Sequence, residues 1–222
     1  MKLDCSTDSY ETLYARWLDR PGSLLDWGGY DPLSHILLDL CGGTGAVACE
    51  AYLRGRARAD VRKTPFPITL LDLNPRINFA ARAIPEKAIL TIQGRAEDLA
   101  VLSGDRSWNF VVCRQALGYL KLPELVRSLY CSMTPGGAFV CNAFVKPKWS
   151  IRPYRFKKRW YLEASGYWGK RVFHLQAMMG DYDVTAFQWY STHEIVSAFM
   201  PCFTLEHFDE TEVSLRFMFR RK

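Results

Sequence analysis

The chain has 222 residues, of which 49% are hydrophobic and 23% are charged, with a formal net charge of +6. This size and composition predict a globular domain and disfavour the disordered, collagen-like and low-complexity classes. No apolar stretch approaches the roughly 20 residues that span a bilayer, and the first residues lack the apolar core of a secretory signal. We therefore expect a cytoplasmic protein without a membrane span.

Seven cysteines are spread along the chain. None of them forms a CxxC pair, and only four histidines are present, whereas a zinc site needs clustered Cys and His ligands. A disulfide framework needs an oxidising compartment, of which the sequence gives no sign. The expectation is free, buried thiols and no metal site.

The first 30 residues predict a helical cap. Tyr10, Tyr14 and Trp17 recur at helical spacing in residues 8–18. A second helical stretch, at 24–27, ends in a Gly-Gly pair that stops it.

Residues 36–142 predict alternating strands and helices. A nearly continuous apolar run at 35–40 leads into a glycine-rich turn and a helix at 46–54, which is the usual opening of a doubly wound α/β sheet. The further strands and helices of this section are predicted at 68–72, 74–83, 88–92, 108–113, 122–133 and 138–142.

The remainder of the chain has a different pattern. Stretches of alternating polarity at 171–176 and 183–190 are typical of antiparallel strands, and we interpret 143–190 as a lid inserted over the carboxyl edge of the sheet. Ser191 and Glu194 form the sequence pattern of a capping box at the start of a helix. Closing strands are predicted at 203–208 and 213–219, as a hairpin at the edge of the sheet.

The predicted architecture is a Rossmann-like α/β domain. It has a mostly parallel seven-stranded sheet with helices on both faces and an antiparallel lid insertion. The parts of this one domain are the helical cap 1–30, the core 36–142, the lid 143–190, and the closing helix and strands 191–222.

Five ordered motifs carry a family resemblance. The sequence LDLCGGTG at 38–45 resembles the Asp-x-x-x-Gly-x-Gly turn of the class I S-adenosylmethionine-dependent methyltransferases. The other four motifs follow in the order of that family: LLDLN at 70–74, GRAEDL at 94–99, FVVCRQAL at 110–117 and MTPGGA at 133–138. Together the motifs cover the core, and the match is similar to the small-molecule group that methylates ubiquinone and menaquinone.

The resemblance implies S-adenosylmethionine as cofactor and S-adenosylhomocysteine as product. It places Asp39 under the glycine turn, where it accepts hydrogen bonds from the turn amides or from the cofactor through water. Gly43 and Gly45 would lie beside the methionine moiety, and Asp72 would accept both ribose hydroxyls, as a carboxylate with two oxygens can. The other implied cofactor contacts are Leu73, Ala96, Glu97, Cys113, Arg114 and Tyr14, the last from the N-terminal helix.

Structural roles are open beside these implied ones. Asp72 can cap the helix that follows it, Arg114 can form a surface ion pair, and the stripe that includes Tyr14 can simply pack on the sheet. A dinucleotide site is the alternative for the turn, with Ala48 at the position of its third glycine.

The chain departs from the family pattern at two positions. The usual Gly-Cys order is reversed to Cys41-Gly42, and Arg95 stands where an acid often precedes the alanine. The second departure leaves the contact to the adenine amine to Glu97, Asp98 or the backbone.

Methyl transfer requires chiefly that the acceptor atom be aligned with the activated methyl group. A base is needed only where the acceptor loses a proton. His174 in the lid, whose ordinary pKa lies near neutrality, and Tyr119 after the fourth strand are the candidate catalytic residues. For His174 a hydrogen-bonded structural role is the alternative.

The segment 146–161, KPKWSIRPYRFKKRWY, interleaves basic and aromatic residues. This pattern suits an anionic or aromatic small molecule, an amphipathic surface or, less favoured here, single-stranded nucleic acid. We expect methyl transfer to an O, N or C atom of an aromatic or amphiphilic metabolite. The alternatives are an RNA or protein methyltransferase and an inactive cofactor-binding partner protein, and the sequence gives no oligomeric state.

Overall fold

A computed structural model describes residues 23–43, 45–58, 68–73, 88–144, 151–156, 159–164, 172–173, 188, 190–210 and 214–222. The helices predicted at 8–18 and 74–83, and the residues Tyr14 and His174, lie outside the described residues. Among the described residues, no helix has the length and apolar character needed to cross a membrane.

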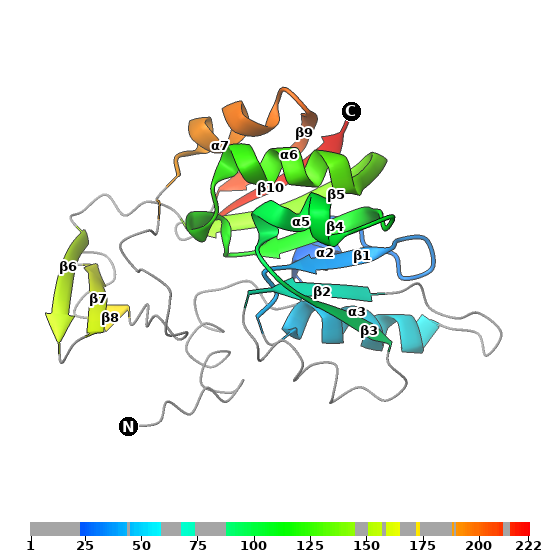
Figure 1. The fold of residues 1–222 in the computed structure, drawn as a ribbon, viewed down its shortest axis with the longest axis horizontal. Helices are drawn as coiled ribbons and strands as arrows, with labels where there is room; N and C mark the ends of the chain where they lie inside the picture. Colours follow the sequence, from blue (N-terminus) through cyan, green and yellow to red (C-terminus); the bar gives the residue numbers. More distant parts are fainter. Residues whose placement is uncertain are drawn as a thin grey trace.

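The described residues form a seven-stranded sheet in the order β3-β2-β1-β4-β5-β10-β9 (Figure 1). Strands β1 to β5 run parallel, and β10 pairs antiparallel with both β5 and β9. The bounds are β1 (Leu37–Leu40), β2 (Ile68–Asp72), β3 (Ile89–Gln93), β4 (Trp108–Arg114), β5 (Met133–Phe144), β9 (Phe203–Glu210) and β10 (Ser214–Arg221). The predicted Rossmann-like sheet and its closing edge hairpin are thereby confirmed.

The central strands are apolar because both faces of the sheet are covered. Every residue of β1 and β2 is buried, whereas the outer strand β3 has exposed and half-buried positions. A strand covered on both faces has no position that favours a polar side chain, so its sequence is a continuous apolar run. This is the pattern from which these strands were predicted.

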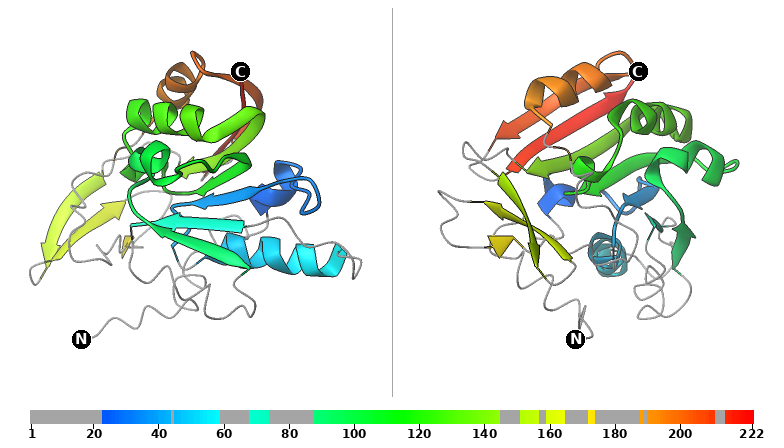
Figure 2. Two further views of the ribbon diagram at one scale, coloured as in Figure 1. Left: turned by 45° about the vertical axis from the view of Figure 1, so that its right-hand side comes forward. Right: turned by 60° about the vertical axis from the view of Figure 1, so that its left-hand side comes forward.

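Two apolar clusters hold helices against the two faces of the sheet (Figures 1 and 2). One face carries α5 (Leu99–Leu102), α6 (Leu122–Ser132) and α7 (Thr192–Phe199), and the other carries α2 (Ser23–Trp27) and α3 (Ala46–Arg58). Phe199 of α7 stacks on Phe139 of β5 and Phe219 of β10, with ring centroids 5.2 and 4.5 Å apart. Because successive residues of a strand point to opposite faces, strands β1 to β5 and β10 each contribute residues to both clusters.

Strand β5 differs from its prediction at the start. The strand was predicted to begin at residue 138, but the preceding Pro135-Gly136-Gly137 sequence also lies within β5. The register passes from Trp108↔Met133 to Phe110↔Ala138, so these residues loop out of the ladder, with Gly136 at φ 72°. A bulge uses the same residue types as a turn, and the pairing of the partner strand decides between them.

A separate three-stranded antiparallel sheet lies within the predicted lid (Figure 1). It contains β6 (Ile151–Phe156), β7 (Arg159–Ala164) and β8 (Val172–Phe173). The antiparallel character was predicted, but the positions were partly wrong. Gln188 and Tyr190 lie outside any strand although a strand was predicted at 183–190.

Helix α7 begins with the predicted capping box. The Ser191 hydroxyl accepts from the Glu194 amide at 3.2 Å, and the Glu194 carboxylate accepts from the Ser191 amide at 2.7 Å. Two amides at the helix start that have no partner within the helix are satisfied in this way.

Replacing Ser191 with alanine is expected to lower the free energy of unfolding by about 1 kcal/mol, because it leaves the Glu194 amide without its acceptor. Urea denaturation measures the change. The exposed Ser197 of the same helix provides the matched control, since Ser197→Ala replaces serine with a better helix former and is expected to be neutral or slightly stabilising. Equal effects of the two substitutions would contradict the capping role.

Candidate functional site at the carboxyl edge of the sheet

The glycine turn connects β1 to α3 in a left-handed backbone conformation. Cys41, Gly43 and Gly45 have φ values of 56°, 58° and 86°. The Gly45 amide donates to the Gly42 carbonyl and the Cys49 amide to the Gly45 carbonyl, both at 2.8 Å, so the turn leads directly into α3. A Cβ atom placed on Gly43 would meet no atom within 4 Å. The turn therefore presents open backbone at the edge where open α/β sheets bind ligands.

The reversed Cys41-Gly42 order has a steric explanation. A Cβ at position 42 would lie 2.4 Å from Leu70 Cδ1 and 2.5 Å from Asp39 Cγ, so only glycine fits there. Cys41 instead adopts a backbone conformation that costs a non-glycine residue roughly 1–2 kcal/mol. The hydrogen bond with the Cys113 thiol, followed by burial, raises the pKa of Cys41 well above its ordinary value of 9.0. The Cys41 thiol is therefore protonated at neutral pH.

Asp39 lies fully buried beneath the turn. Its Oδ2 accepts from the Ala48 amide of α3 at 3.0 Å, and among the described residues its Oδ1 has no hydrogen-bond partner. Burial raises the pKa of Asp39 to about 7, against the opposing influence of Arg114 and the Ala48 amide. Asp39 thus lies under the turn, and the amide from which it accepts belongs to the first turn of α3.

Asp72 ends β2 and faces the glycine turn. Its Oδ2 accepts from the Gly43 amide at 2.8 Å, and its backbone carbonyl accepts from the Gly94 amide at 3.0 Å. These two bonds fix the carboxylate beside the open side of the turn. The neighbouring Leu73 is 41% exposed, which leaves an apolar surface next to that carboxylate.

The third motif forms the 3₁₀ helix η3 (Ala96–Asp98). Ala96 is buried in the apolar cluster, and the Glu97 carboxylate accepts from the Lys121 amide at 3.3 Å. Arg95, which replaces the acid of the family, is exposed and lies 3.8 Å from Glu97. Asp72 and Glu97 both raise the pKa of Cys41, so the ends of β1, β2 and η3 lie within electrostatic range of each other.

The residues after β4 occupy the neighbouring part of the edge. Cys113 is fully buried, and Arg114 is close enough to Asp39 to lower the pKa of that carboxyl. Tyr119 is half-buried in the 3₁₀ helix η4 (Leu117–Tyr119). The structure thus gathers Asp39, Gly43, Asp72, Cys113, Arg114 and Glu97 at this edge.

Two residues at this edge were missed in the sequence. Gln115 has a φ of 60° and is 8% exposed, and among the described residues its Nε2 is a buried donor without a partner. Its backbone amide donates to Oδ1 of Asn142 at 2.8 Å, and Asn142 is completely buried on β5. A polar residue at the end of the apolar stretch AFVCN was the one available signal for Asn142.

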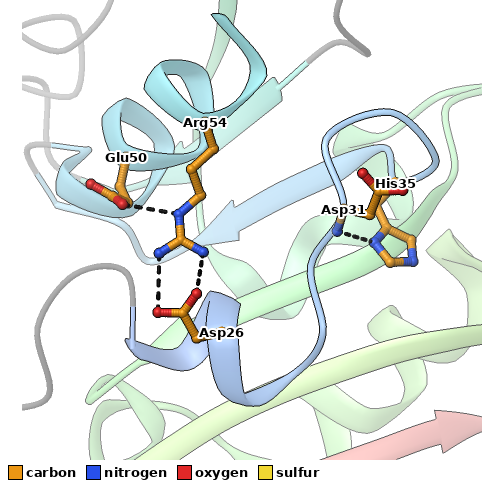
Figure 3. Close-up of polar contacts among 5 residues, drawn as sticks. All are labelled: Asp26, Asp31, His35, Glu50 and Arg54. Carbon is orange, nitrogen blue, oxygen red and sulfur yellow. Dashed lines mark hydrogen bonds and ion pairs between the residues drawn. The ribbon is translucent and has the colours of Figure 1, made fainter. Parts of the chain in front are cut away.

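The opposite edge of the sheet contains a cavity of about 340 Å³, lined in part by Asp26 and Arg54. The Arg54 guanidinium is engaged by Asp26 at 2.5 and 3.2 Å and by Glu50 at 2.9 Å (Figure 3). Near it, Nδ1 of His35 accepts from the Asp31 amide at 2.9 Å, and burial lowers the pKa of His35, which favours the neutral ring that can accept (Figure 3). The ion pairs of Arg54 and the hydrogen bond of His35 therefore stabilise the fold in this region.

The sequence matches no protein-family profile and no curated protein. Solved structures are similar to it in fold. An S-adenosylmethionine-dependent methyltransferase from Mesorhizobium loti shares 16% identity at a TM-score of 0.61, over 90% of this chain and 98% of that one. The Burkholderia thailandensis 1,6-didemethyltoxoflavin-N1-methyltransferase shares 14% identity at 0.61, over 97% and 85%. A Pyrococcus horikoshii protein shares 13% identity at 0.62, over 96% and 99%. The chain has the class I fold of S-adenosylmethionine-dependent methyltransferases.

Proposed function

We propose that this protein is an enzyme that transfers a methyl group from S-adenosylmethionine to a small molecule. The observation that carries the proposal is the pairing of the open glycine turn with the Asp72 carboxylate, joined by the 2.8 Å bond from the Gly43 amide. Two solved structures of the same fold support it, because they are described as complexes with S-adenosylmethionine and S-adenosylhomocysteine.

The residues at the carboxyl edge fit this cofactor. Gly43 has space for a ligand where a side chain would stand, and the buried Oδ1 of Asp39 has no hydrogen-bond partner among the described residues. Asp72 offers acceptor oxygens to a ribose diol, since a carboxylate accepts more than the one bond that Gly43 donates. We assign the remaining contacts to Gly45, Leu73, Ala96, Glu97, Cys113, Arg114 and Tyr14.

The bound cofactor supplies a methyl group that its sulfonium already activates. This chain contributes the positioning of the two reactants. The glycine turn and the Asp72 carboxylate would hold the cofactor, and the lid residues would hold the acceptor. Alignment of this kind contributes roughly 7–11 kcal/mol to lowering a barrier. Where the acceptor atom carries a proton, we assign His174 as the group that accepts it, and Tyr119 as a catalytic-site residue that faces the acceptor.

We propose an aromatic or amphiphilic acceptor, as in the ubiquinone and menaquinone group. One solved structure of the same fold is described with the heteroaromatic compound 1,6-didemethyltoxoflavin bound. The basic and aromatic sequence of 146–161 is suited to an anionic or planar molecule. The proposed ribose contact Asp72 lies on the β2 side of β1, and we place the acceptor beyond Cys113 and Arg114 of β4, toward β5.

Calorimetric titration with S-adenosylmethionine and S-adenosylhomocysteine tests the proposal. We expect micromolar affinity for the wild type and at least tenfold weaker binding for Asp72→Ala, since a tenfold change corresponds to about 1.4 kcal/mol and at least one charge-assisted bond is lost. The exposed Asp105 gives the control variant Asp105→Ala, which is expected to bind as the wild type does. A folded wild type that binds neither compound would contradict the proposal.

A further inference from the structure

Among the described residues, four buried side-chain nitrogen or oxygen atoms have no hydrogen-bond partner. They are Asp39 Oδ1, Gln115 Nε2, Ser132 Oγ and Arg221 Nε. Gln115 directly follows β4 and Asp39 lies near the end of β1, so these two atoms belong to neighbouring strands at the carboxyl edge. Ser132 precedes β5 and Arg221 ends the antiparallel β10, which places both at the opposite edge. One acceptor and one donor are therefore left unpaired at the edge that carries the candidate site.

Gln115 combines two unfavourable features. Its backbone is left-handed, at φ 60°, in a residue that is not glycine, and its buried side-chain donor has no partner within the described part of the chain. The strained backbone is held by the 2.8 Å bond that the Gln115 amide donates to the fully buried Asn142. Strain and an unpaired donor both disfavour the folded state, and such features persist where a ligand-binding role retains them.

The sheet order separates Gln115 from the proposed contacts to the ribose and the adenine. The proposed cofactor contacts Asp72 and Glu97 come from β2 and from the residues after β3, on one side of β1. Gln115 comes from β4, on the other side of β1 and next to β5. A donor at that position lies next to β5, beyond the proposed cofactor contacts Cys113 and Arg114, where the acceptor is proposed to bind.

We infer that the side-chain amide of Gln115 binds the acceptor substrate and selects molecules that carry a hydrogen-bond-accepting oxygen, above all a carboxylate or carbonyl, near the methylated atom. This inference rests on the proposed function. A buried donor that is built to receive an oxygen discriminates strongly against an analogue without it, because the donor then stays unpaired. Gln115 is thus a specificity-determining residue.

Matched pairs of acceptors provide the test. Salicylate is compared with phenol, and 2-aminobenzoate with aniline, so that each pair shares the acceptor atom and differs by one carboxylate. Formation of S-adenosylhomocysteine is measured for the wild type and for Gln115→Leu, which keeps the size of the side chain and removes the donor. We expect the wild type to prefer the carboxylate-bearing member of a pair, and the variant to lose at least tenfold in kcat/KM on that member. The affinity for S-adenosylhomocysteine is expected to stay within twofold.

Stability gives a second readout. Because Gln115→Leu removes an unsatisfied donor, its Tm is expected to equal or exceed that of the wild type. Ser132→Ala is the matched control, since it removes an unpaired atom at the opposite edge and is expected to leave turnover unchanged. Where Gln115→Leu does not fold, Gln115→Asn retracts the amide by one carbon, tolerates the left-handed backbone, and is expected to show the same loss of turnover.

Different results contradict the role of Gln115 and the proposed methyltransferase function. Unchanged kcat/KM in Gln115→Leu overturns the inference, and so does a parallel loss of affinity for S-adenosylhomocysteine, which would assign the amide to the cofactor. A wild type that binds S-adenosylhomocysteine but shows no preference for either carboxylate-bearing acceptor overturns the substrate class. A wild type that does not bind S-adenosylhomocysteine overturns the proposed function itself.

Discussion

Replacing Gly42 with alanine is expected to destabilise the fold by about 2–3 kcal/mol, the upper part of the roughly 1–3 kcal/mol that overpacking a close-packed interior costs. The added Cβ would lie 2.4 Å from Leu70 Cδ1 and 2.5 Å from the Asp39 carboxyl carbon. Both neighbours are completely buried, so neither can move away without disturbing the sheet beneath the turn. The backbone at Gly42 is not left-handed, so the loss arises from crowding alone.

Urea denaturation of Gly42→Ala and of Gly104→Ala separates crowding from backbone strain. Gly104 has a φ of 57° with no atom within 4 Å of an added Cβ, so its substitution is expected to cost only the roughly 1–2 kcal/mol of a left-handed residue. The double variant Cys41→Gly/Gly42→Cys restores the family order and is expected to remain destabilised, because the clash belongs to position 42. Wild-type stability in that double variant would contradict the steric explanation.

The strands could be predicted where burial on both faces of the sheet makes their sequence apolar throughout. The runs at 37–40 and 68–72 are apolar throughout because helices cover both sides of the sheet, and an apolar run of strand length is visible in the sequence. The capping box at Ser191 could also be predicted, because its bonding partners lie only three residues apart in the sequence. The start of β5 could not be predicted, because the bulge at 134–137 depends on the pairing of β5 with Trp108 of β4.

The candidate site could be predicted only where the family motifs name a residue. Asp39, Gly43 and Asp72 were expected at this edge from the motifs, but the bond between Gly43 and Asp72 joins residues 29 positions apart. The contact between Gln115 and Asn142 spans 27 positions and depends on the register of β4 against β5. Local sequence carries no information on that register. The strained backbone of Gln115, and the side-chain amide nitrogen that has no partner among the described residues, therefore appear only in the structure.

Asp39 is expected to make the stability of the free protein fall as the pH rises from about 4 to 7. Burial raises its pKa from 3.8 in the reference state to about 7 in the fold. Between these two values the folded chain retains a proton that the unfolded chain has released, so stability decreases with pH by linkage. The contribution is fully present below about 3.8 and is lost by about 7, a difference on the order of 4 kcal/mol at 1.36 kcal/mol per pKa unit.

The comparison of wild type with Asp39→Asn isolates this group. Urea denaturation from pH 4.5 to 8 is expected to show the two proteins diverging with rising pH, with the variant becoming the more stable one, because an amide carries no charge to bury. Arg114 and Asp72, which act electrostatically on the carboxyl, are common to both proteins. Groups that titrate elsewhere, such as His35, cancel in the difference. A pH-independent difference would contradict a raised pKa at Asp39. Burial of the Asp39 charge, with one oxygen unpaired among the described residues, is explained by a cation or hydrogen-bond donor of a ligand that binds at the site. The difference in stability between wild type and Asp39→Asn is therefore expected to shrink in saturating S-adenosylmethionine.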